Sequence, residues 1–175
     1  MRARSIPQIR VVAFDAVGTL IYAEPSVTAA YRTAITRHGA PDPGQDEVRR
    51  IVAASLSARS RGADLSTSEE QEVAFWRQLV EQFFSRPDTA AACFQELWDH
   101  FADARNWRCF DDVSATLDSL QERNIPVAVA SNFDSRLNPV CNGLNELRTL
   151  GARFISSEVG FRKPDPQFFR RIAEH

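Results

Sequence analysis

The stretch from residue 9 to residue 20, IRVVAFDAVGTL, constrains the fold more than any other part of the chain. Its apolar run Val11–Phe14 has the length of one strand buried on both faces of a sheet. Asp15 follows at once, and a carboxylate beside a buried strand costs free energy unless something compensates it. Gly18 then permits a turn. In open parallel sheets, ligands bind at the carboxyl ends of the strands. We therefore expect Asp15 to end a central strand and to belong to a ligand site. The alternative is an Asp that only caps a turn.

Two later stretches repeat this arrangement of a strand followed by polar residues. The apolar, β-branched run Ile125–Ala130 predicts a second buried strand, and Ser131 and Asn132 follow it. Phe154–Ser157 predicts a short third strand, and Lys163 follows it in the segment GFRKPDP. If the first two strands are parallel neighbours, Asp15 and the Ser-Asn pair meet at the same edge of the sheet. Lys163 is the one lysine among 21 basic residues.

The chain between these stretches has a helical pattern throughout. Ser68 and Gln71 have the spacing of a capping box. Phe and Trp recur at helical spacing in the two helices expected after Ser68 and after Pro87, and we interpret them as core rather than as a ligand pocket. Strands therefore alternate with helices at both ends, around an all-helical block. This order predicts an α/β core domain formed by residues 1–20 and 106–175, interrupted by a helical insertion at 21–105.

Helix ends are also indicated in the residues around the predicted strands. Ser26 and Asp165 are suitable N-caps, with Pro166 as a first helical residue, and Asp111 or Asp112 can cap a helix that ends at Asn124.

Composition limits the classes of partner. The chain has 175 residues, is 43% hydrophobic and 25% charged, and carries a net charge of −2, which argues against a nucleic-acid or membrane surface. It contains no apolar run of membrane-spanning length and no signal-peptide pattern, so we expect a cytoplasmic protein. Cys93, Cys109 and Cys141 are odd in number and far apart, which argues against disulfides and against a cysteine metal site.

The motifs resemble those of the haloacid dehalogenase (HAD) superfamily of hydrolases. FDAVGTL is similar to the family's D-x-D-G-T-L, whose first Asp forms a covalent aspartyl intermediate; the resemblance implies that Asp15 is the nucleophile and that Thr19 shapes its loop. It also implies that Ser131 and Asn132 bind the transferred group, and that Lys163 pairs with the nucleophile and with the substrate anion. The family's fold is a Rossmann-like α/β core with a parallel sheet, and the helical insertion resembles its cap domain.

The sequence departs from the family in two places. Val17 replaces the second Asp, the general acid and base of the family's phosphatases, and its loss slows phosphomonoester hydrolysis by roughly 10² to 10⁴. Family members hold Mg²⁺ with the first Asp (Asp15), the backbone carbonyl two residues on (Val17) and an acidic fourth motif, G-D-x-x-x-x-D. The sequence up to His175 has no Gly-Asp pair. We therefore expect a truncated piece or a shortened descendant of the family, with an incomplete Mg²⁺ ligand set and impaired catalysis. We also expect an exposed sheet edge that recruits another chain, which can be a second copy of this one.

Three functions remain open. Hydrolysis of a small phosphorylated metabolite with Mg²⁺ is the leading one, on the family's prevalent chemistry. The 2-haloacid dehalogenases have D-A-Y-G-T-L, close to Asp15–Leu20 except for the missing Tyr, and expel halide without protonation or Mg²⁺. The third is a degenerate relative that binds a partner or an anion. In the first two, the partner is a small anionic substrate.

Overall fold

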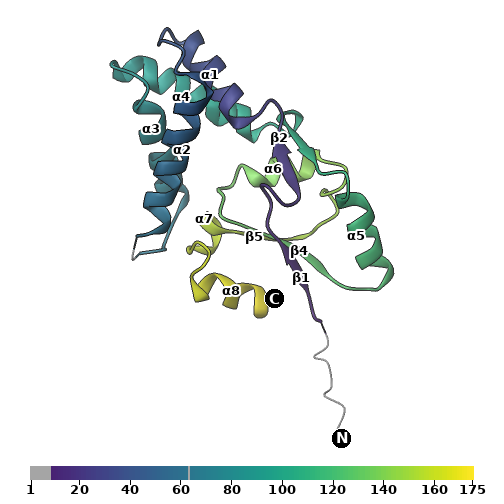
Figure 1. Cartoon of the computed structure of the whole chain (residues 1–175). Helices are drawn as coiled ribbons and strands as arrows, with labels where there is room; N and C mark the ends of the chain where they lie inside the picture. The colour runs from purple at the N-terminus through teal and green to yellow at the C-terminus, as the bar shows by residue number, and fades with distance from the viewer. Residues whose placement is uncertain (1–8, 63) are drawn as a thin grey trace, which may run out of the picture.

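A parallel sheet holds the strands that the sequence predicted (Figure 1). The computed structural model describes residues 9–62 and 64–175, so the first eight residues of the predicted core range lie outside the described part. The sheet has the strand order β1 (Val12–Phe14), β4 (Val127–Ser131) and β5 (Ala152–Ile155), all parallel. Phe14 pairs with Val129. The first two predicted strands are therefore parallel neighbours, which is the condition for Asp15 and the Ser131–Asn132 pair to meet at one edge of the sheet.

The prediction that the first strand is central and buried on both faces is wrong for the described residues. β1 is an edge strand, Ala13 is exposed, and Val12 and Phe14 are only partly buried. The Val12 N–H donates to Pro126 O over 2.9 Å, toward β4, and no described strand pairs with the other side of β1. An apolar run indicates that a segment suits a β-sheet, but it does not indicate whether that strand lies at the centre or at the edge of the sheet.

A small antiparallel ribbon, which sequence reasoning missed, lies where the chain leaves and re-enters the parallel sheet region. It pairs β2 (Ile21–Ala23) with β3 (Trp107–Cys109). Each strand has three residues, too few for a periodic pattern to be read. A short 3₁₀ turn, η1 (Ala104–Asn106), precedes β3, and the Glu24 N–H donates to Asn106 O over 2.9 Å. The ribbon thus ties together the two chain segments that lead into the helical block.

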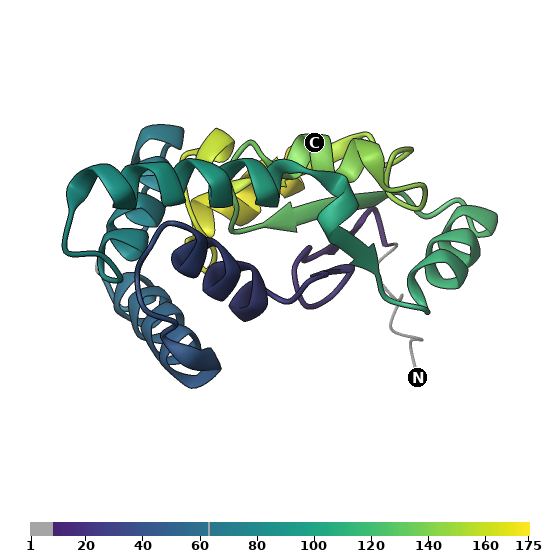
Figure 2. The same ribbon diagram turned by 90° about the horizontal axis from the view of Figure 1, so that it is seen from above.

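The helical block predicted between the strands is present. Figure 2 shows α1 and α4 lying side by side, and α3 packs on α4. Ser68 Oγ accepts a hydrogen bond from the Gln71 N–H, so the predicted N-cap of the third helix is confirmed. Ser26 caps the first helix in the same way. The four helices are α1 (Val27–Arg37), α2 (Gly44–Ser60), α3 (Glu69–Glu81) and α4 (Pro87–Ala102).

The second α/β segment differs from its prediction in detail. Asp165 caps the last helix through the Gln167 N–H, as predicted, whereas Asp112 precedes its helix without a side-chain cap. Ser156 and Ser157, expected in the third strand, instead begin a short helix that ends at Val159 and is followed by Gly160 with φ +90°. The helices here are α5 (Val113–Glu122), α6 (Leu137–Gly143), α7 (Ser156–Val159) and α8 (Pro166–Ala173).

One continuous hydrophobic cluster joins the helical block to the α/β part. Tyr31 and Leu97 come from the helices, Val129 and Ile155 from the sheet, and Trp107 from the ribbon between them. Cys93, Cys109 and Cys141 are free thiols, and burial raises the pKa of Cys93 and of Cys109 to about 12. Within the described ranges no helix is both long and apolar enough to cross a bilayer.

Candidate active site

Asp15 and Lys163 face each other at the carboxyl end of the sheet. Lys163 Nζ lies 3.0 Å from Asp15 Oδ1 and donates a hydrogen bond to Ala130 O over 2.7 Å. The Ala16 N–H donates to the same Asp15 oxygen over 2.8 Å. The Asp15 side chain is 46% exposed, against 21% for Lys163. The carboxylate is therefore open to a ligand on one side, while its charge is opposed by an ammonium group that the end of β4 holds in place.

Asn132 fixes the position of the lysine. Its side-chain Oδ1 accepts from the Lys163 N–H over 2.7 Å, and its Nδ2 donates to Lys163 O over 3.0 Å. Because both hydrogen bonds go to the backbone of Lys163, they fix the position of that residue relative to Asn132. The segments after β4 and β5, 31 residues apart in the sequence, are thereby joined directly. Asn132 thus has a positioning contact in this structure, beside the ligand-binding role that the resemblance implies.

The other predicted site residues lie at the end of β4 and in the loop after β1. Ser131 is the last residue of β4 and is buried, and Thr19 is exposed in the loop after β1. Val17 is 40% exposed in the same loop. Gly18 has φ +84°, a conformation that favours glycine, and its N–H donates to Ile21 O over 2.8 Å. The turn carries Asp15 and Val17 on one short, internally bonded loop.

Sequence reasoning missed a buried ion pair beside Asn132. Arg136 donates to both carboxylate oxygens of Asp134, each over 2.7 Å, and the two side chains are 8% and 1% exposed. The guanidinium also lies 3.6 Å from the centre of the Trp98 ring. No local signal distinguishes an Asp and an Arg of this kind from surface residues, because burial here comes from a helix distant in sequence.

Sequence reasoning also missed a contact between the helical block and residues 160–163, the segment that ends at Lys163. The Thr67 N–H donates to Gly160 O over 3.0 Å, and the Arg162 N–H donates to Leu65 O over 2.8 Å. The Glu69 carboxylate accepts from the Ser135 N–H over 2.8 Å and from the hydroxyls of Ser135 and Ser157. The connection between α2 and α3 is thus bonded to the residues that lead into Lys163.

The described residues do not form a complete Mg²⁺ site. Asp15 offers one carboxylate and Val17 one backbone carbonyl, and no group of three or more His, Cys, Asp or Glu in the described ranges is placed to hold a metal ion. Mg²⁺ prefers six oxygen ligands in octahedral geometry and keeps several waters. We therefore assign no chemical step to a metal on these residues.

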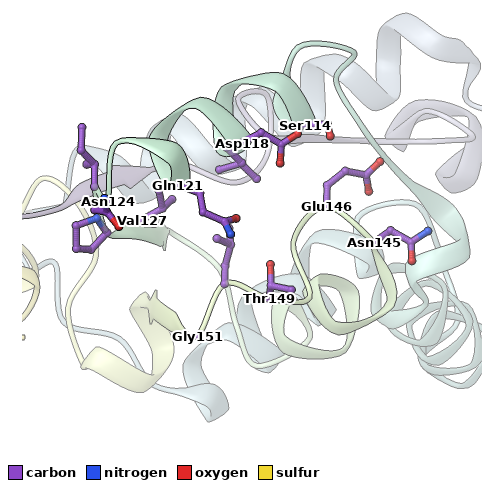
Figure 3. A pocket seen from close by; sticks show the side chains of 13 residues that line it. Ser114, Asp118, Gln121, Asn124, Val127, Asn145, Glu146, Thr149 and Gly151 are labelled. Carbon is purple, nitrogen blue, oxygen red and sulfur yellow. The ribbon is translucent and has the colours of Figure 1, made fainter.

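A large hollow lies away from the Asp15–Lys163 pair (Figure 3). It has a volume of about 880 Å³ and lies between α5 and the segment after α6, near the start of β4. Asp118 and Glu146 are among its lining residues, which include no Lys or Arg. An anionic substrate is repelled by this lining, whereas Lys163 attracts it at the opposite end of the strand.

Comparison with known proteins shows the family and the fold. The sequence profile of the haloacid dehalogenase-like hydrolases matches residues 9–175. Haloacid dehalogenase-like hydrolase domain-containing protein 3 of Bos taurus is 28% identical over 171 residues, which cover 93% of this chain and 67% of that protein.

Solved structures share the fold at low identity. A predicted phosphoglycolate phosphatase from Haemophilus somnus superposes with a TM-score of 0.64 at 14% identity, covering 97% of this chain and 72% of that one. A dehalogenase solved with an intermediate complex superposes with a TM-score of 0.66 at 15% identity, with the same coverage. The fold is therefore shared with proteins named as a phosphatase and as a dehalogenase.

Proposed function

Because the chain belongs to the haloacid dehalogenase-like hydrolases, we propose that it hydrolyses small phosphate esters through an aspartyl-enzyme intermediate on Asp15. The observation that carries the proposal is the 3.0 Å approach of Lys163 Nζ to Asp15 Oδ1 at the carboxyl ends of parallel strands. A half-exposed carboxylate with a fixed cation beside it suits attack on an anionic centre.

The chain's own residues supply the following steps. A carboxylate oxygen of Asp15 attacks phosphorus, and the bond from phosphorus to the ester oxygen breaks, so the electron pair leaves with that oxygen. Lys163 opposes the negative charge on the phosphoryl oxygens, and Asn132 holds the lysine in register. Ser131 and Thr19 contribute the neighbouring hydroxyls. Water then hydrolyses the acyl phosphate and restores the carboxylate.

Carbon–halogen hydrolysis is the second candidate, and Val17 favours it. Halide leaves as a stable anion and needs no proton, so a valine where the phosphatases have an acid costs that reaction nothing. Attack of Asp15 on a carbon that bears halogen uses the same carboxylate. Lys163 then binds the carboxylate group of a 2-halo acid.

The test is release of inorganic phosphate from a panel of phosphate esters, with and without Mg²⁺. We expect Asp15→Asn to lower kcat/KM by about 10³-fold or more, since the nucleophile is lost. Lys163→Met should lower it by about 10² to 10³-fold, and Lys163→Arg should not restore it, because the planar guanidinium cannot occupy the place of the ammonium group.

Other outcomes separate the alternatives. Halide release from 2-halo acids that requires Asp15, without phosphate release, favours the dehalogenase. If Asp15→Asn changes only the affinity for an anion, the chain is a binding protein and the proposed hydrolysis is wrong.

A further inference from the structure

An apolar cavity of about 180 Å³ lies between the helical block and the loops that carry the site. Val17 lines it from the loop after β1, two residues beyond Asp15. Phe133 lines it from the loop after β4, next to Asn132. One of its core-side loops therefore carries Asp15, and the other carries Asn132, which bonds to the Lys163 backbone.

The rest of the wall is almost entirely apolar. The three tryptophans of the chain all line it. The aromatic residues read from the sequence as core thus also form the wall of a cavity. The lining residues from the helices and the ribbon are Val27, Tyr31, Val52, Leu56, Trp76, Val80, Phe94, Leu97, Trp98, Phe101 and Trp107.

The polar groups of the wall offer no free charge to a charged ligand. Arg136 is neutralised by its bidentate pair with Asp134 and is covered by the Trp98 ring. Burial raises the pKa of Tyr31 far above its usual value, so its phenol stays neutral. A charged group in this cavity would lose its hydration without gaining a free partner.

The volume of the cavity limits the size of the ligand group that can occupy it. A closed apolar cavity of roughly 150 Å³ is known to stay dry and to bind benzene. The present cavity is slightly larger, and its aromatic walls offer edge and face contacts to a ring. A single aromatic ring fits this volume.

Val17 gives an independent reason to expect an aromatic ring in the leaving group of the substrate. Without a proton donor at this position, the ester oxygen must leave as an anion. The pKa of a phenol is about 10, against about 16 for water, so an aryl ester expels its oxygen anion far more readily than an alkyl ester does.

We propose that the substrate is an aryl phosphate ester whose ring occupies the cavity between the helical block and the Val17 and Phe133 loops. This inference rests on the proposed function. Asp15 forms the new bond to phosphorus, the bond from phosphorus to the aryl oxygen breaks, and the electron pair leaves with the phenolate, which takes its proton from water. Water then releases phosphate from Asp15.

Tryptophan fluorescence tests the proposal directly, because all three indoles line the cavity. Phenylphosphonate and methylphosphonate carry the same charged group, and neither is hydrolysed. Titrated into the full chain, phenylphosphonate should bind about 10- to 100-fold more tightly, the value expected for burying one ring. Equal affinities, or no saturable change with either compound, overturn the proposal.

A pair of variants on α2 locates the ring. Leu56 lines the cavity at 40% exposure, so Leu56→Asp places a charge at the wall without emptying a buried site. We expect it to reduce the preference for phenylphosphonate to less than about threefold. Ala54→Asp adds the same charge to an exposed position that does not line the cavity, and should leave the preference unchanged. A preference that survives Leu56→Asp, or that Ala54→Asp removes equally, overturns the proposal.

Phosphate release separates this proposal from the proposed function. If the ring preference is present and no aryl ester is turned over by an Asp15-dependent route, hydrolysis fails while the binding site stands. If Asp15-dependent hydrolysis occurs without any preference for aryl over alkyl esters, hydrolysis stands and the aryl substrate class is wrong.

Discussion

Val17 stands where the D-x-D-G-T-L motif has its second Asp, and adding an acid there should extend the range of substrates. Val17 is 40% exposed and lies two residues beyond Asp15, so a carboxyl group at this position remains accessible to solvent and ligand. We expect Val17→Asp to raise kcat/KM for benzyl phosphate, an alkyl ester, by about 10²-fold or more, because the leaving oxygen then receives a proton. The gain for phenyl phosphate should be smaller, and steady-state phosphate release measures both.

Val17→Asn is the matched control, because asparagine has nearly the shape of aspartate but transfers no proton. It should give no gain on the alkyl ester. An equal gain with both variants would assign the effect to polarity of the loop rather than to proton transfer.

At the scale of single residues, the sequence predicts which polar groups follow strands but not which groups they contact. Asp15, Asn132 and Lys163 could be found because each follows an apolar run, and parallel pairing brings such positions together. Arg136 and Glu69 could not, since their partners come from packing between distant elements. The predicted catalytic and binding roles remain predictions.

At the scale of elements, the start of α3 holds the helical block against the core. Glu69 bonds the Ser135 and Ser157 segments, and the neighbouring Thr67 and Arg162 amides bridge the same two parts. We expect Glu69→Ala to speed hydrogen exchange at the Thr67 and Arg162 amides by about 10- to 100-fold, because charged hydrogen bonds contribute about 1.5–3 kcal/mol. Amide exchange followed by NMR or mass spectrometry reports the change, and Val129 in the sheet should be unaffected.

Glu70→Ala is the control for this contact. Glu70 lies in the same first turn, is exposed, and accepts a hydrogen bond from the Ser68 hydroxyl within its own segment. Exchange at Thr67 and Arg162 should stay at the wild-type rate in this variant. Faster exchange in both variants would mean that loss of negative charge at the helix start, and not the contact with the core, is responsible.

Element prediction succeeds where a pattern repeats and fails where an element is short. The long amphipathic helices α1 to α4 each contain several turns of apolar spacing, and they were predicted. The three-residue strands β2 and β3 and the four-residue helix α7 each span fewer than two periods, so no pattern repeats, and they were missed. Pairing across the ribbon and hydrogen bonds such as Ser156 Oγ to Phe133 O form these short elements, so tertiary contact determines them.

At the scale of the whole molecule, the β1 edge of the sheet is open: no described strand pairs with its outer side. A groove of about 450 Å³ runs along β1 and is lined by Val11, Ala13, Phe169 and Ile172, with Asp15 and Lys163 at one end. Phe169 is 47% exposed on α8. Unpaired strand edges with apolar flanks pair readily with another strand, and whatever covers this groove also borders the site.

This open side predicts self-association through β1 that depends on Phe169. Sedimentation velocity over a concentration series should show a monomer–dimer equilibrium, and Phe169→Asp should weaken it by at least about tenfold, because each copy loses the burial of one aromatic ring and gains a charge at the interface. Leu56→Asp introduces the same charge at an exposed apolar residue on the helical block and should leave the equilibrium unchanged. A chain that stays monomeric at every concentration, or that dimerises equally well with Phe169→Asp, would mean that the β1 edge does not recruit a second copy.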